Sequence, residues 1–240
     1  MERGGKKKKK NPAFFLKAGV LVLFLFLQVY FIFIKTHPTL DINVWPNEKP
    51  GPDLVSGERI GQTFVAKTDN LSRVEIMLGT HDRQSRQDIL FKLFAVQSGR
   101  DLLVEKTFNA SEVVNNRFHQ IDFEPIRESR DRKYYFELIS PGSKPEEAFC
   151  IWMNSRNIYR PGERLLNNKV HKGDLIFRIY SQRPIYSELG RIVKNYPGIL
   201  GKTWFLIVTI IFFEAAQFLI LVMLMNYFEK FLRKENNDSG

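Results

Sequence analysis

Two groups of side chains in this sequence have the chemistry to bind a carbohydrate. Aromatic faces can pack against a sugar ring, while amide and guanidinium groups can donate hydrogen bonds to its hydroxyls. The larger group follows a strand-like run and consists of Trp152, Asn154, Arg156, Tyr159 and Arg160. The smaller group lies in a loop-like stretch and consists of His81, Arg83 and Arg86. We interpret both as candidate glycan-binding residues. The alternative is that Trp152 belongs to a core and that the arginines are solvated.

Patterns typical of catalysis or metal binding are missing from the sequence. None of the 4 histidines, nor Cys150, lies in an HExxH or paired-cysteine pattern that would indicate zinc. The sequence has no GxSxG, P-loop or GxGxxG motif, and no DxDxDG calcium loop. Cys150 lies in an apolar run, so we interpret it as a packing residue. We therefore predict no catalytic residue, no metal site and no cofactor, and a protein that is not an enzyme.

Two long apolar runs, 13–34 and 203–228, enclose the polar middle of the chain. Each has the ~20 apolar residues that a helix needs to cross ~30 Å of hydrocarbon, so we predict two transmembrane helices. The basic tail 1–12 and the tail 229–240 are placed in the cytoplasm, because short basic flanks stay inside. A cleaved signal peptide is disfavoured, because the first run is longer than the apolar region of such peptides.

This topology makes the middle of the chain extracytoplasmic in a two-pass cell-membrane protein. A single cysteine allows no internal disulfide, which favours a prokaryotic membrane over a eukaryotic secretory one. The net charge of +10 owes much to a run of five lysines at positions 6–10. Beside a membrane span, we interpret this run as a topology signal that attracts anionic lipid, and we predict no nucleic-acid partner.

Polar side chains lie inside the apolar runs, among them Gln28 in the first and Glu214 and Gln217 in the second. Glu214 is expected near the membrane midplane, and Gln217 lies about one turn further along the same helix face. Polar groups inside a bilayer usually face protein or water. We therefore predict that these residues contact another helix, belonging to this chain, a second copy or a polytopic membrane protein. A role in proton relay or substrate contact is the alternative.

The middle of the chain alternates apolar and polar residues as β-strands do. Turn-forming residues separate the strand-like runs, which are 60–67, 73–80, 89–96, 102–108, 118–123, 134–139, 149–153 and 175–181. We predict an all-β antiparallel sandwich of about 8–9 strands over 57–183, after a proline-rich linker over 35–56. Helical spacing over 184–202 predicts a short amphipathic helix that lies in the membrane interface or against the sandwich.

Three strand phrases of the middle region resemble a known kind of domain. They are GQTFVAKTDNLSRVEIMLGT (61–80), IDFEPIRESRDRKYYFELISP (121–141) and GDLIFRIYS (173–181). Residues 57–181 resemble the jelly-roll modules found beside membrane spans in prokaryotic proteins of cell-surface glycan assembly, which are similar to carbohydrate-binding modules. The resemblance implies a β-sandwich able to bind sugar. It carries over no sugar-contacting residue, because such modules vary those positions freely.

We therefore expect a membrane-anchored glycan-binding or accessory module, a subunit of a cell-surface polysaccharide synthesis or export assembly. Its expected partners are membrane lipid, a glycan, and a polytopic membrane protein or a second copy reached through the spans. One alternative is a structural subunit that binds only protein. Another is a polysaccharide chain-length regulator, which shares the two-span plan but carries long helical segments that this loop lacks. An enzyme acting on lipid-linked sugar is disfavoured by the missing acid–base pattern.

Overall fold

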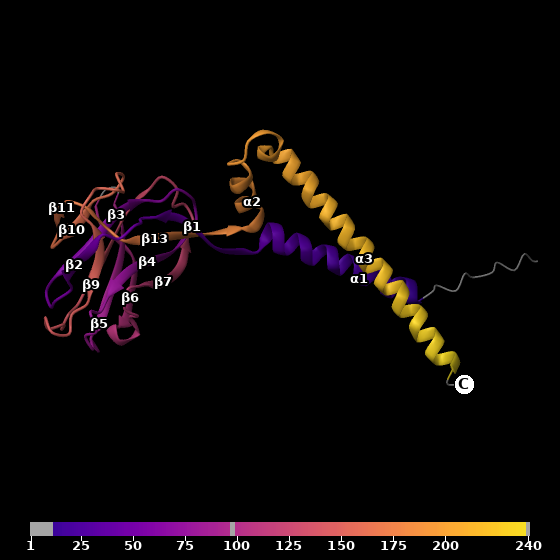
Figure 1. Ribbon diagram of the computed structural model, residues 1–240, viewed down its shortest axis with the longest axis horizontal. Helices are drawn as coiled ribbons and strands as arrows, with labels where there is room; N and C mark the ends of the chain where they lie inside the picture. Colours follow the sequence, from indigo (N-terminus) through magenta and orange to yellow (C-terminus); the bar gives the residue numbers. More distant parts are fainter. Residues whose placement is uncertain (1–11, 97–98, 239–240) are drawn as a thin grey trace, which may run out of the picture. The chain divides into compact units, whose positions relative to one another are not determined.

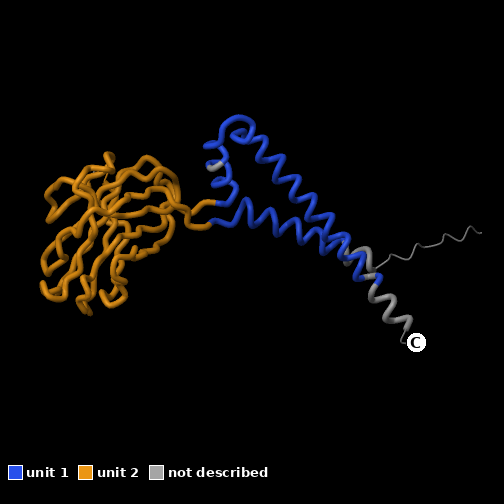
Figure 2. Tube along the Cα trace, in the orientation of Figure 1, with its two compact units in different colours: residues 1–36, 184–240 blue, residues 37–183 orange. Residues whose placement is uncertain are grey.

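The structure, a computed structural model, describes residues 12–96 and 99–238 (Figure 1). The chain divides into two compact units (Figure 2). Residues 37–183 form the β unit, and residues up to 36 together with those from 184 onward form the helical unit. The predicted basic tail 1–12 lies outside the described residues except for Pro12.

The predicted antiparallel β architecture of the middle region is confirmed. The strands are β1 (Thr36–Asn43), β2 (Lys49–Asp53), β3 (Arg59–Val65), β4 (Leu71–Gly79), β5 (Asp88–Ala95), β6 (Asp101–Asn109), β7 (Arg117–Ile126), β8 (Lys133–Ile139), β9 (Cys150–Asn154), β10 (Arg164–Leu166), β11 (Lys169–His171), β12 (Asp174–Leu175) and β13 (Phe177–Pro184). Sheet A has the order β1-β13-β4-β9-β12, with β2 also on β9 and β7 also on β4. Sheet B has the order β11-β10-β3-β8-β5-β6.

The core of the β unit follows from the strand alternation. Val74, Ile76 and Leu78 of β4 are fully buried, as the period of two predicts for the inward face of a strand. Aromatic rings from the two sheets meet in this core. The ring of Phe177 on β13 lies 6.2 Å from that of Phe64 on β3 and 5.5 Å from that of Phe136 on β8. Burying these large side chains is the main favourable contribution to folding of this unit.

Several turns have the backbone conformation that their residues favour. Asn70, Asn116 and Gly173 all have positive φ, which asparagine and glycine tolerate best. At Gly173 the backbone passes so close to β9 that a Cβ atom would lie 2.2 Å from the carbonyl oxygen of Asn154. The predicted breaks at these three positions are therefore found in the structure.

The segment 35–56, predicted as a linker, instead supplies strands to sheet A. β1 lies beside β13, and β2 pairs with β9, with Pro50 opposite Trp152. Proline cannot donate a ladder hydrogen bond, but it is tolerated in a strand at a sheet edge. Proline content alone therefore misled the linker prediction. The short β10–β11 hairpin was also not predicted, because strands of three residues carry too little alternation to detect.

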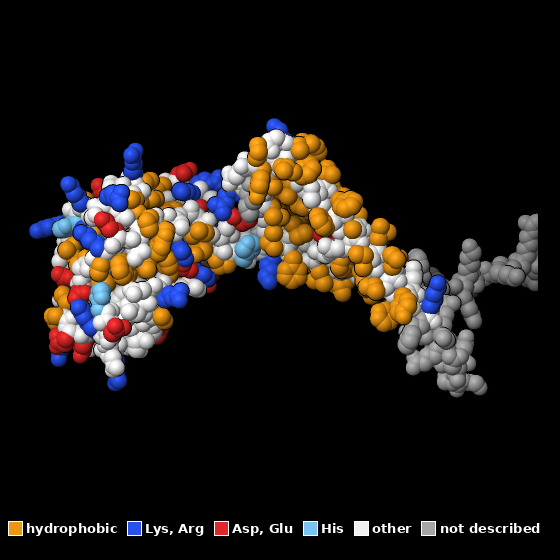
Figure 3. All heavy atoms as spheres, viewed as in Figure 1, with side chains coloured by type: hydrophobic (Ala, Val, Ile, Leu, Met, Phe, Trp, Pro, Cys, Tyr) orange, Lys and Arg blue, Asp and Glu red, His pale blue; other side chains and the backbone are white. Residues whose placement is uncertain are grey.

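The helical unit contains α1 (Pro12–Val29), the π-helical turn η1 (Tyr30–Ile34), α2 (Ile185–Val193), the 3₁₀ turn η3 (Gly198–Gly201) and α3 (Thr203–Asp238). The 3₁₀ turn η2 (Ala110–Glu112) belongs to the β unit. Within α3, the segment Thr203–Phe228 is long and apolar enough to cross a membrane. Hydrophobic side chains cover the visible face of this unit (Figure 3). The helix α3 continues past the predicted span end at 228.

The first predicted span, 13–34, is helical, but among the described residues only Thr203–Phe228 is long and apolar enough to count as a membrane-crossing helix. Its apolar part among the residues searched is Ala18–Ile34, a shorter apolar helix. The helix predicted over 184–202 also ends early, because α2 stops at Val193 and the chain turns through η3 into α3.

Candidate functional site

The predicted site on β9 contains one aromatic residue, Trp152, that packs against the core cluster but keeps part of its surface exposed. Trp152 is partly buried, and its Nε1 donates a hydrogen bond to Asn116 Oδ1 at 2.9 Å. Asn154 is only 4% exposed, and its side chain is used internally. Its Nδ2 donates to the Pro46 carbonyl at 3.0 Å, and its Oδ1 accepts from the Arg156 backbone N–H at 2.9 Å. Asn154 therefore fixes the local backbone, while Trp152 retains exposed ring surface.

Tyr159 packs in the core of the β unit. Its ring meets that of Phe177 edge to face at 5.6 Å, and its hydroxyl accepts a hydrogen bond from the Val65 backbone N–H at 3.1 Å. Burial raises the pKa of this phenol above its usual value. Arg156 and Arg160 are exposed at the surface of the same loop. The ring face of Tyr159 is therefore not available for stacking on a ligand.

Two residues of the smaller predicted group, His81 and Arg83, contact residues in or beside sheet A. His81 Nε2 lies 3.1 Å from Cys150 Sγ. Arg83 Nη1 donates to Asp53 Oδ2 at 2.6 Å and to the Ala148 carbonyl at 2.9 Å. These contacts bring the 81–86 loop to the start of β9, two residues before Trp152. Arg86 is exposed, with its carbonyl accepting from Asn109 Nδ2 at 2.9 Å.

Cys150 is a buried thiol that contacts His81. Burial raises the pKa of the Cys150 thiol, which keeps it protonated beside His81. Among the described residues, no three or more His, Cys, Asp or Glu side chains are placed to hold a metal ion. The contact between Cys150 and His81 therefore positions a loop.

The outer face of sheet A carries an aromatic cluster that the sequence did not reveal. Because Val74, Ile76 and Leu78 point to one side of the sheet, Met77 and Gly79 of β4 lie on the other side, where both are buried. Their register partners, which share that face, are Phe118 and Cys150. Trp152 follows Cys150 by two residues and therefore also lies on this face.

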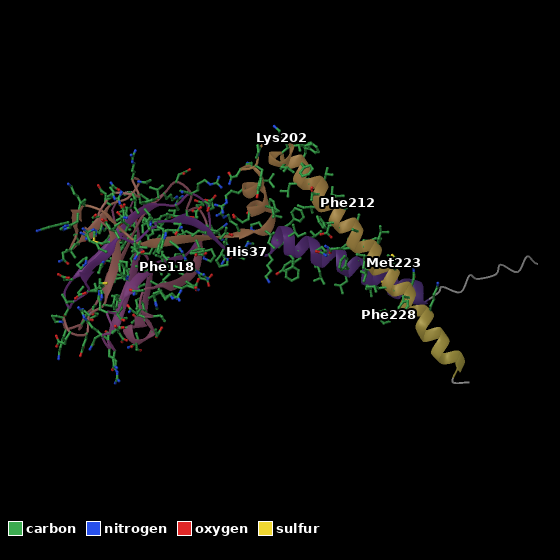
Figure 4. All side chains as sticks on the ribbon, viewed as in Figure 1. His37, Phe118, Lys202, Phe212, Met223 and Phe228 are labelled. Atoms are coloured by element: carbon green, nitrogen blue, oxygen red, sulfur yellow. The ribbon has the colours of Figure 1, made fainter. Side chains whose placement is uncertain are left out.

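Trp45 completes the cluster. It is 49% exposed, and its ring centroid lies 6.3 Å from that of Phe118. We call Trp45, Met77, Phe118 and Trp152 the aromatic face; Figure 4 labels Phe118 on the β unit. The absence of a side chain at Gly79 makes room for the Trp152 indole, because a Cβ atom at position 79 would lie 2.8 Å from Trp152 Nε1.

Polar side chains border the aromatic face and are held in place by one another. The Arg178 guanidinium lies over the Phe118 ring, 3.9 Å from its centroid, and Arg178 Nε donates to Asn43 Oδ1 at 3.1 Å. Glu75 is 8% exposed and accepts from the Tyr180 hydroxyl at 3.1 Å. Burial and then the Glu75 charge raise the pKa of Tyr180, which therefore remains a hydrogen-bond donor.

A detectable signal for this face existed in the strand alternation. Outward-facing Phe118 on β7 and Arg178 on β13 alternate with core residues, so they could have been assigned to one outer surface. Alternation does not assign Trp45 to this face, because its proline-rich segment, 35–56, shows no strand period. A separate groove of about 500 Å³ lies beside the 155–163 loop and is lined by polar residues that include Ser155, Glu163, His171 and Lys172.

The helical unit brings two of the three predicted intramembrane residues together. Gln28 Nε2 on α1 donates a hydrogen bond to Gln217 Oε1 on α3 at 2.6 Å. Glu214 lies on the wall of a large apolar groove, and its Oε2 is buried with no hydrogen-bond partner in the part of the chain that the structure describes. The two apolar helices are therefore joined by an amide pair rather than by Glu214.

The sequence matches no protein-family model, and a search of the curated proteins finds no significant match. Function must therefore be inferred from the geometry of the two units.

Proposed function

We propose that this protein is a membrane-anchored glycan-binding module, an accessory subunit of a cell-surface polysaccharide assembly. The β unit is a jelly-roll-like β-sandwich on the extracytoplasmic side, and the two apolar helices both span the membrane and leave the termini in the cytoplasm. The observation that carries the proposal is the aromatic face, in which the ring of the exposed Trp45 lies 6.3 Å from that of Phe118 and Trp152 lies on the same side of sheet A.

The chemistry of the aromatic face suits a carbohydrate. An exposed indole offers a flat apolar surface to the C–H face of a sugar ring, and such a contact needs little rearrangement when the ring is already held. The guanidinium of Arg178 and the amide of Asn116 can donate to hydroxyls at the edge of that ring. Both are already fixed by contacts with Phe118 and Trp152, so binding would immobilise few side chains.

The anchoring half of the proposal rests on the exposed apolar surface of the helical unit. Phe212, Met223 and Phe228 project from α3 and are 70%, 70% and 59% exposed (Figure 4). A soluble protein rarely exposes a contiguous apolar surface of this kind. The hydrogen bond between Gln28 and Gln217 also fits a bilayer, where an amide without a partner is costly.

The test uses the full chain in detergent micelles, first on a glycan array and then by calorimetric titration with the glycans retained. Replacing Trp45 or Trp152 by alanine should weaken binding by about tenfold, because an aromatic contact is worth up to ~1.5 kcal/mol. The matched control is Trp204→Ala, which removes the third tryptophan of the chain, on α3. If no glycan binds, or if both variants bind as the wild type does, the proposal is wrong.

One observation favours a second candidate, a subunit that binds protein. Among the described strands, β6 pairs only with β5, so its outer edge is open. Leu102 and Leu103 on this edge are 49% and 44% exposed. Such an edge can receive a strand from another protein. Replacing Leu103 by lysine should then release a partner that co-purifies at fixed stoichiometry, while leaving glycan binding unchanged.

A further inference from the structure

The helical unit contains an apolar groove with cationic side chains near one end. The groove encloses about 1290 Å³ and is lined by α1, η1, α2 and α3. Its walls include Phe33, Tyr186, Leu206, Ile210 and Phe218. The rings of Phe33 and Tyr186 lie 5.3 Å apart, which joins η1 to α2. Nothing in the aromatic face of the β unit contributes to this groove.

The cationic residues of the groove wall are Arg191, on α2, and Lys194, which directly follows the end of α2. Residues three apart lie on the same side of a helix, and the Lys194 N–H continues the helical turn by donating to the Gly190 carbonyl at 3.3 Å. Arg191 Nη2 donates to Glu188 Oε2 at 2.7 Å, which leaves other guanidinium N–H groups free to bind an anion. Both cationic side chains are exposed.

These cations lie close to the start of α3. A Cβ atom at Gly201 would lie 2.1 Å from the Tyr196 carbonyl oxygen and 3.5 Å from that of Val193, so the end of α2 adjoins the residues that lead into Thr203. From Thr203 the groove follows α3 through Glu214 to Leu219, ~24 Å along the helix axis. This length exceeds the ~15 Å depth of one leaflet, half of a ~30 Å hydrocarbon core, so an acyl chain has room to lie along it.

We propose that this groove binds one anionic glycerophospholipid of the bilayer, with its phosphate at Arg191 and Lys194 and an acyl chain along α3. Charge complementarity selects a lipid over a second apolar helix, because only an amphiphile places an anion at one end and hydrocarbon along the rest. The inference rests on the membrane anchoring proposed above and is independent of glycan binding. It makes the helical unit a selective lipid site as well as an anchor.

The experiment is native mass spectrometry of the full chain released from nanodiscs that contain equal amounts of phosphatidylglycerol and phosphatidylcholine. The wild type should retain one phosphatidylglycerol. Each cation removed should weaken retention roughly fivefold, and the double variant Arg191→Ala, Lys194→Ala roughly 25- to 30-fold. Lys230→Ala, which removes a cation outside the groove, should retain the lipid as the wild type does.

A second variant distinguishes the contribution of the apolar wall to lipid retention from that of the two cations. Ile210→Trp keeps both cations but fills the apolar wall, so it should also lose the lipid. Equal retention of the two lipids, retention by the double variant, or a lipid-free dimer would each overturn the proposal. Glycan titration of the same nanodisc samples reports on the aromatic face alone, so a failure of one proposal is distinguishable from a failure of the other.

Discussion

Replacing Gly79 by alanine tests whether the position of the Trp152 indole carries glycan binding. A Cβ atom at position 79 would lie 2.8 Å from Trp152 Nε1 and 3.1 Å from Cys150 Sγ. Both distances are shorter than ordinary van der Waals contact, so the indole must move. Its hydrogen bond to Asn116 Oδ1, 2.9 Å long in the structure, should then be lost.

The Gly79→Ala variant should lose affinity while keeping its stability. Losing one hydrogen bond costs about 1 kcal/mol. Alanine at position 79, the last residue of β4, is favoured over glycine by up to about 1 kcal/mol, because glycine loses more backbone freedom on folding. These contributions nearly cancel, so the free energy of unfolding should change by less than about 1 kcal/mol. Glycan affinity should fall by about tenfold, since the indole no longer faces the ligand.

Three measurements on the full chain in micelles check this prediction: calorimetric titration with glycan, tryptophan emission and unfolding in urea. The control is Gly99→Ala, because a Cβ atom there meets nothing within 4 Å. A Gly79→Ala variant with shifted emission and unchanged glycan affinity would refute the assignment of Trp152 to the binding face. A large loss of stability would instead refute the reasoning that the two energetic contributions cancel.

Three further predictions concern other parts of the chain. Burial lowers the pKa of His119 below 6.5, so the unfolded state binds a proton at a higher pH than the folded state does. The free energy of unfolding should therefore fall as pH drops below about 6.5. In His119→Phe, the slope of the unfolding free energy against pH should be smaller. Lys106→Cys should react with a membrane-impermeant maleimide added outside intact cells. The wild type should not react, because its only cysteine is the buried Cys150. Labelling of the variant only after lysis would contradict the proposed extracytoplasmic position of the β unit. A double-mutant cycle of Gln28→Leu and Gln217→Leu should give a coupling energy of about 0.6 kcal/mol, measured by unfolding in detergent, and zero coupling would contradict the contact.

The strands with clear alternation were predictable because their burial is decided locally. In β4, the apolar residues Val74, Ile76 and Leu78 alternate with residues of the other face, and all three are fully buried. Register and neighbours were not predictable in this way. β4 pairs with β7, β9 and β13, and only the folded structure shows that Met77 is opposite Phe118. Those pairings depend on long-range contacts that no local period encodes.

The candidate site was less predictable than the fold, for two physical reasons. Tyr159 lies in a polar loop, yet it is buried because its backbone N–H donates to Asp174 Oδ2 at 2.8 Å and folds the loop inward. Trp45 lies in a proline-rich segment, yet it reaches Phe118 because β1 and β2 join sheet A. By contrast, the contact between Gln28 and Gln217 follows from a local rule, since polar groups in apolar helices seek partners.

The geometry of the aromatic face also bears on how tightly it should bind. It offers the exposed indole of Trp45 and the partly exposed indole of Trp152, and each such contact contributes up to ~1.5 kcal/mol, so one sugar unit should bind weakly. The proposed anchoring would change this, because copies held in one membrane would meet successive units of the same polymer and later contacts would become intramolecular. Under the proposed function, a single short sugar should therefore bind the detergent-extracted chain with low but measurable affinity, while a long polymer should be retained more strongly by many copies in one membrane. Polymer retention that does not increase with the density of protein in the membrane would argue against this use of the face.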